Sequence, residues 1–125
     1  LVMPLAGKLT IEVVSLSGGP DSAGFMDKTD PYVRVTLHDG QFDEGGVHRG
    51  EVIRTKTKNN AGGTATFNET FHINKPENMD CLRVELWDED TISDDVKGSG
   101  DVDLDTVIQA GTGKWVTKEA SLCKR

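Results

Sequence analysis

Cysteine is scarce in this 125-residue sequence, which contains only Cys81 and Cys123. Small secreted domains that depend on disulfide bonds carry more cysteines, so this class is excluded and a cytoplasmic location is expected. Long apolar runs are also missing, because no stretch approaches the about 18 residues that a membrane-spanning helix needs. The length fits a single domain over residues 1–125. Since the chain begins at Leu1 rather than Met, it is also considered as a fragment of a longer protein.

Positive charge is in short supply, with 14 basic residues against 21 acidic ones and a net charge of -7. Proteins that bind nucleic acid usually carry a basic surplus, so a nucleic-acid partner is excluded. Most of the acidic surplus lies in two stretches, which hold eight carboxylates and two lysines. The eight carboxylates belong to Asp21, Asp27, Asp30, Asp88, Glu89, Asp90, Asp94 and Asp95.

Catalytic motifs are missing as well. The three histidines are scattered, and neither a Gly-x-Ser-x-Gly motif nor a Cys-x-x-Cys pair is present. The Gly98-Ser99-Gly100 segment lacks the third glycine and the following helix of a dinucleotide site. We therefore expect that the protein is not an enzyme.

Short segments of alternating apolar and polar residues recur along the chain, as is typical of half-buried β-strands. The seven segments are residues 8–13, 32–37, 51–58, 65–73, 81–87, 102–104 and 115–122. Residues 39–50 hold several glycines without periodicity and are expected to form a long solvated loop, whereas residues 105–109 allow one helical turn. Regularly spaced short strands with turn residues between them predict an all-β sandwich or barrel.

The acidic stretch from Asp88 to Asp95 directly follows the predicted strand 81–87, which leaves its carboxylates at one end of a sheet. Neighbouring carboxylates repel one another, and protonation, solvent or a bound cation relieves this repulsion. Calcium takes about six to eight hard oxygen ligands, which loops rich in carboxylates and carbonyls supply. The spacing alone leaves two alternatives open, namely a calcium site and solvated turn carboxylates.

Five short motifs follow one another in a set order. They are Asp30-Pro31-Tyr32-Val33, Arg54-Thr55-Lys56-Thr57-Lys58, Phe67-Asn68-Glu69-Thr70-Phe71, Leu82-Arg83-Val84-Glu85-Leu86-Trp87-Asp88-Glu89-Asp90 and Asp95-Val96-Lys97-Gly98. In this order the sequence resembles a C2 domain over nearly its whole length. The resemblance implies an eight-stranded antiparallel β-sandwich with calcium-binding loops at one end. Seven of these strands are evident, and the eighth falls on residues 1–5 or is absent.

The resemblance also implies which aspartates bind Ca²⁺, since C2 domains use those of the first and third loops. By position, the matching residues are Asp30, Asp88, Asp90 and Asp95. Gly24 stands where the family usually has a further aspartate, so Asp27 is expected to replace it, with Asp21 as the alternative. The third loop is about one residue short, so Asp94 competes with Asp95 as a ligand.

Two further groups of residues are candidates for lipid binding. Large apolar side chains inside the acidic loops either cap the sandwich or enter a membrane beside the calcium site, and we favour the second role. These side chains are Phe25, Met26 and Ile92. Arg54, Lys56 and Lys58 share one face of a predicted strand. C2 domains often use such a strand for anionic headgroups, although a charged strand at a sheet edge also discourages aggregation.

The resemblance thus predicts calcium-dependent binding to an anionic phospholipid membrane surface. The protein would be cytoplasmic and would become a peripheral membrane protein on calcium binding. The alternative is a calcium-independent C2-type interaction or scaffold domain with a protein partner, which the glycine at position 24 favours.

Overall fold

The computed structural model describes residues 6–20, 22–24, 27–43, 46–108 and 113–124. Its strands and helix run in the order β1 (Gly7–Leu16), β2 (Ser22–Gly24), β3 (Asp27–Lys28), β4 (Pro31–Asp43), β5 (Gly46–Arg54), β6 (Ala65–Lys75), β7 (Cys81–Asp88), β8 (Asp95–Asp103), α1 (Leu104–Ile108) and β9 (Cys123–Lys124). No helix within these ranges is both long and apolar enough to cross a membrane.

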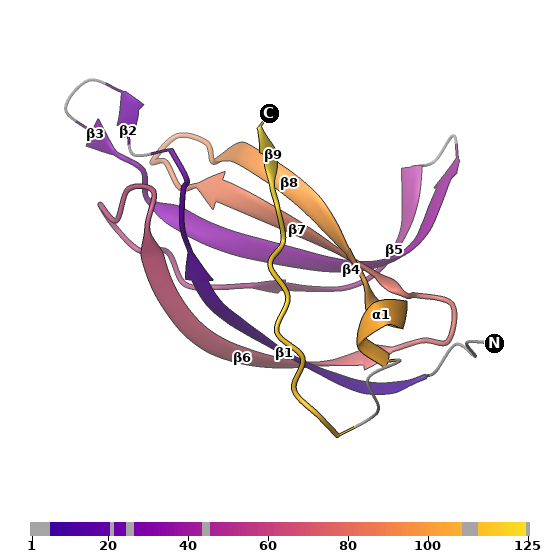
Figure 1. The fold of residues 1–125 in the computed structure, drawn as a ribbon. Coiled ribbons are helices and arrows are strands. Elements are labelled where there is room, and N and C mark those ends of the chain that lie inside the picture. The colour runs from indigo at the N-terminus through magenta and orange to yellow at the C-terminus, as the bar shows by residue number, and fades with distance from the viewer. Residues whose placement is uncertain (1–5, 21, 25–26, 44–45, 109–112, 125) are drawn as a thin grey trace.

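The strands form an antiparallel β-sandwich, as predicted. One layer has the strand order β5-β4-β7-β8-β9, and β1 pairs with β6 in the other layer (Figure 1). A small β2–β3 hairpin projects from the end of the sandwich where β4 begins (Figure 1). The predicted strands at residues 8–13, 32–37, 65–73 and 81–87 are confirmed as β1, β4, β6 and β7. The predicted helical turn is confirmed as α1.

Alternation along β4 builds the core between the two layers. Val33, Val35 and Leu37 lie on one face of this strand and are buried, with Leu37 0% exposed. Phe67 and Ile73 of β6 belong to the same cluster, and the apolar residues of β1 pack against it. Removing side chains of this size from water stabilises a fold by about 1.5–3 kcal/mol each. This core fixes the direction of β4 and thereby the place of the loop that precedes it.

Residues 39–50 do not form the predicted loop. The described part of this segment continues β4 to Asp43 and starts β5 at Gly46, and these two residues are partners in the ladder. Register shifts interrupt the β4–β5 pairing, and Gly40 has a positive φ of 75°. Such irregularities break the two-residue periodicity on which the sequence prediction depends, and glycine adopts this conformation without strain.

The predicted strand at residues 51–58 ends early, at Arg54. Beyond it, the Thr55 hydroxyl accepts the Val33 N–H at 2.9 Å, in place of a backbone carbonyl. Lys58 then donates its backbone N–H to the Pro31 carbonyl. Lys56 and Lys58 therefore lie in the connection between β5 and β6, and the prediction that they extend a strand from Arg54 was wrong.

The C-terminal part of the sandwich also differs from the prediction. Of the strand expected at residues 102–104, Val102 and Asp103 are the end of β8, which begins at Asp95, and Leu104 starts α1. Residues 115–122 form no strand in the described structure, and β9 pairs with β8 only through residues 123–124. A Cβ atom on Gly100 would collide with the Ser121 carbonyl, so the absence of a side chain allows this close approach. The alternative eighth strand at residues 1–5 lies outside the described residues.

Candidate functional site

The start of β4 and the end of β7 bring two predicted calcium ligands together. Pro31 and Asp88 are partners in the β4–β7 ladder, so Asp30 and Asp88 lie at the same end of the sheet. The Asp30 backbone N–H donates to Asp88 Oδ1 at 2.9 Å, and the Glu89 N–H donates to the Asp30 carbonyl at 3.0 Å. Asp30 Oδ1 accepts the Asn60 N–H at 2.6 Å. These bonds join the loops before β4, after β5 and after β7.

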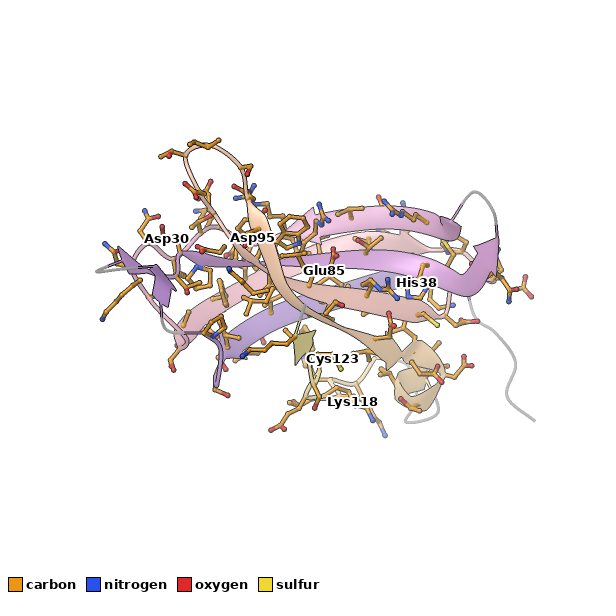
Figure 2. All side chains as sticks on the ribbon, turned by 90° about the horizontal axis from the view of Figure 1, so that it is seen from above. Asp30, His38, Glu85, Asp95, Lys118 and Cys123 are labelled. Carbon is orange, nitrogen blue, oxygen red and sulfur yellow. The ribbon has the colours of Figure 1, made fainter. Side chains whose placement is uncertain are left out.

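The loop between β7 and β8, residues 89–94, projects from this end (Figure 2). Asp90 is exposed, whereas Asp94 turns back to the sheet. The Tyr32 hydroxyl donates to Asp94 Oδ2 at 2.6 Å, and the Asp90 N–H donates to Asp94 Oδ1 at 3.2 Å. Asp95 lies at the same end as Asp30 (Figure 2), and its side chain, 69% exposed, forms an ion pair with Lys97 at 2.9 Å.

The Tyr32–Asp94 contact affects the ionisation of both groups. The hydrogen bond from Tyr32 lowers the pKa of Asp94, and the backbone N–H of Asp90 lowers it further. Burial raises the pKa of Tyr32 to about 12, and the bond to Asp94 acts in the same direction. At neutral pH the phenol therefore remains a donor and the carboxylate remains charged, which favours a charge-assisted hydrogen bond.

Arginine and aromatic side chains continue from Tyr32 across the outer face of the larger sheet. The rings of Tyr32 and Trp87 stack with centroids 6.2 Å apart. The Arg54 guanidinium carbon lies 3.7 Å from the Tyr32 ring centroid, and that of Arg34 lies 4.3 Å from the Trp87 centroid. Arg54 also forms a 3.4 Å ion pair with Glu89 of the loop. We call Tyr32, Arg34, Arg54 and Trp87 the arginine–aromatic face.

A shallow groove of about 240 Å³ continues this face along β4, β5 and β7. It is lined by Arg34, Thr36, His38, Arg49, Val52, Arg83 and Glu85. Figure 2 shows His38 toward the end of β4 that lies away from Asp30, with Glu85 between them. Glu85 pairs with Arg34 at 3.0 Å, and Asp101 pairs with Arg83 at 3.2 Å. Two of the three arginines that line the groove are thus paired with carboxylates, and Arg49 accounts for its small surplus of positive charge.

The sequence prediction missed most of this face, although its signal was present. Tyr32 and Arg34 alternate with the apolar residues of β4 and must point away from the core. Trp87 is the direct ladder partner of Tyr32, which only the β4–β7 register reveals. Of the predicted basic residues, Arg54 belongs to the face, and Lys56 and Lys58 follow it outside the strand.

The remaining predicted residues have different outcomes. Ile92 is at the tip of the β7–β8 loop and is 94% exposed. The backbone of Asp27 lies in β3 opposite Gly24, but its side chain is outside the described part of the structure. Asp21, Phe25 and Met26 lie outside the described residues. Their predicted roles in cation and lipid binding therefore stay predictions.

The donors at this end fit calcium in their chemistry, because Asp30, Asp88 and Asp90 offer hard carboxylate oxygens. Their arrangement fits less completely. No three His, Cys, Asp or Glu side chains converge as a metal-binding group among the residues that the structure describes. Asp94 and Asp95, which would complete such a group, are turned to Tyr32 and Lys97. A cation site between these loops therefore requires a side-chain rearrangement or a contribution from residues 21–27.

Comparison with known proteins gives a family match over most of the chain. The family model of the C2 domain matches residues 7–117. The 16 kDa phloem protein 2 of Arabidopsis thaliana is 29% identical over 105 residues, which are 82% of this chain. The matched part spans 64% of the length of that relative.

Solved structures share the fold. A C2 domain-containing protein superimposes with a TM-score of 0.71 at 24% identity, over 98% of this chain and 80% of that one. A calcium-bound structure of two C2 domains of extended synaptotagmin 2 matches with a TM-score of 0.61 at 23% identity, over 86% of this chain and 38% of that one. A C2 domain of plant extended synaptotagmin 1 matches with the same TM-score of 0.61 at 20% identity, over 78% of this chain and 69% of that one.

Proposed function

Because the chain belongs to the C2 domain family, we propose that it is a calcium-dependent, non-enzymatic module that docks on anionic phospholipid membranes from the cytoplasm. The observation that carries this proposal is the hydrogen bond from the Asp30 backbone N–H to the Asp88 carboxylate at the end of the sandwich. The exposed side chains of Asp90 and Ile92 lie in the loop that continues from it. Carboxylates and an almost completely exposed apolar side chain thus share one end of the molecule.

The chemistry of this end supports a conditional interaction with lipid. Without a cation, the acidic loops repel an anionic surface and oppose the approach of Ile92. Calcium, when bound, supplies positive charge and free coordination positions for phosphate oxygens. Asp30, Asp88 and Asp90 would hold the ion. Asp27 would replace the aspartate that the family usually has at the position of Gly24.

The arginine–aromatic face supports the choice of an anionic lipid. Arg34 and Arg54 lie over aromatic rings, and this contact favours one position of their guanidinium groups. Guanidinium groups bind phosphate through paired hydrogen bonds. A headgroup beside the loops would therefore meet fixed donors on this face, while Ile92 enters the membrane interface.

Vesicle sedimentation tests this function directly. The chain is expected to bind vesicles of phosphatidylserine and phosphatidylcholine in calcium and to leave them in chelator. Each added positive charge near an anionic surface contributes about 1 kcal/mol, so one calcium ion should strengthen binding roughly thirtyfold. Vesicles of phosphatidylcholine alone are the control. Equal binding in calcium and chelator would contradict calcium dependence, and no binding in either would favour the protein-interaction alternative.

The first loop permits a second test. Gly24 and Asp27 are ladder partners, so the backbone of Asp27 lies beside the position at which the family usually has an aspartate. Asp27→Asn is expected to weaken calcium binding about tenfold, since removing one charge beside a cation costs on the order of 1 kcal/mol or more. Asp21→Asn should weaken it less. Calorimetric titration compares the two variants, and a larger loss for Asp21→Asn would reverse the assignment.

A further inference from the structure

The hydrogen bond between Tyr32 and Asp94 connects the β7–β8 loop to the sheet. Tyr32 belongs to β4 and is buried, so its ring is a fixed point. Both carboxylate oxygens of Asp94 accept a hydrogen bond, one from the Tyr32 hydroxyl and one from the Asp90 backbone. The second bond closes residues 90–94 into a turn, and the first holds this turn against β4.

A second contact holds the same loop from the other side. Arg54 stacks on the Tyr32 ring and pairs with Glu89, the first residue of the loop. Tyr32 therefore takes part in the contacts at both ends of the loop, directly through its hydroxyl and through Arg54 at its ring. The loop has these protein partners without any cation.

We propose that the Tyr32–Asp94 hydrogen bond is a latch that holds the β7–β8 loop closed against β4 and competes with a cation for the Asp94 carboxylate. This inference rests on the proposed function. To bind a cation, the Asp94 carboxylate would turn away from the phenol hydrogen and from the Asp90 N–H that now hold it. Binding there must then break the latch, and the apparent calcium affinity is lowered by the free energy of that break.

Tyr32→Phe tests the latch because it removes one oxygen and keeps the buried ring. The first measurement is NMR relaxation of the backbone amides in chelator. Order parameters of residues 90–94 are expected to fall from the rigid range, about 0.85, toward the flexible range below about 0.6. Thr57→Val is the matched control, because it removes a hydroxyl that Arg54 contacts at 3.1 Å but leaves the latch intact. Unchanged order parameters in Tyr32→Phe would overturn the proposal.

Calcium titration of variants at the two ends of the bond provides the second measurement. Tyr32→Phe is expected to lower the calcium concentration for half-saturation about three- to tenfold, the factor that one net hydrogen bond provides. Asp94→Asn is expected to raise the calcium concentration for half-saturation, because this variant lacks the carboxylate that becomes a ligand once the latch opens. If the bond only stabilised the structure, both substitutions would shift the calcium concentration for half-saturation in the same direction. That result would contradict the competition.

Failure of the latch and failure of the proposed function give different results. If no variant binds calcium, the proposed function and the competition are both wrong, and the order parameters in chelator decide whether the latch exists. If the wild-type chain binds calcium and Tyr32→Phe loosens the loop without a gain in affinity, the proposed function stands and the competition is wrong.

Discussion

Calcium at about one hundred times its dissociation constant is expected to stabilise the fold by about 2.7 kcal/mol, and Asp90→Asn is expected to remove most of this gain. For a chain of this length the stabilisation corresponds to a rise in melting temperature of about 10 °C. Asp90 is the exposed carboxylate beside the joined pair of Asp30 and Asp88. Its loss therefore removes a proposed cation ligand without disturbing a buried contact.

Thermal unfolding in chelator and in millimolar calcium measures this effect. Without calcium, Asp90→Asn should melt at or slightly above the wild-type temperature, since it removes one charge from a repulsive cluster. Glu77→Gln is the matched control, because it removes an exposed carboxylate from the connection between β6 and β7. A wild-type melting temperature that does not respond to calcium would contradict the proposed site.

Ile92→Ala is expected to weaken calcium-dependent vesicle binding by about tenfold to a hundredfold. An isoleucine side chain gains about 1.5–3 kcal/mol when it leaves water completely, and alanine retains only part of this gain. Because Ile92 is 94% exposed at the loop tip, almost all of its apolar surface is available to the membrane. Sedimentation with increasing vesicle concentration measures the partition coefficient.

Two controls separate membrane insertion from other effects. The melting temperature of Ile92→Ala should not change, because the side chain makes almost no contact within the fold. Val14→Ala removes part of another exposed apolar side chain, 48% exposed on β1 of the other layer, and should leave vesicle binding unchanged. An equal loss of binding in both variants would indicate non-specific adhesion.

Alternation made most of the sandwich predictable, since Val33, Val35 and Leu37 mark one face of a strand without knowledge of its partners. The long hairpin of β4 and β5 was not predictable in this way. Its register shifts and the positive φ of Gly40 remove the periodic signal, while glycines suggested a loop. The local pattern thus predicted strands where alternation is unbroken over several residues and missed the β4–β5 hairpin, where repeated register shifts interrupt it.

The candidate site was predictable at the level of residue type but not of partner. The acidic motifs place Asp30 and Asp88 at one end, and the β4–β7 ladder does bring them together. The sequence does not reveal that Asp94 accepts a bond from Tyr32, 62 positions earlier, while Asp95 pairs with Lys97. The order of residues in the loop left Asp94 and Asp95 as equivalent alternatives, and only the packing of the loop against β4 distinguishes them.

The pairing of β1 with β6 has a consequence for synthesis on the ribosome. Gly7 is the ladder partner of Lys75, and Leu16 is the partner of Ala65. The ribosome adds about 5–20 residues per second, so roughly three to fourteen seconds pass between the synthesis of β1 and the completion of its partner β6. The β4–β5 hairpin joins neighbouring segments and can close within about 1–10 μs of their emergence. Nascent chains that end before residue 65 therefore expose the apolar face of β1, and we expect them to be preferred substrates for chaperones.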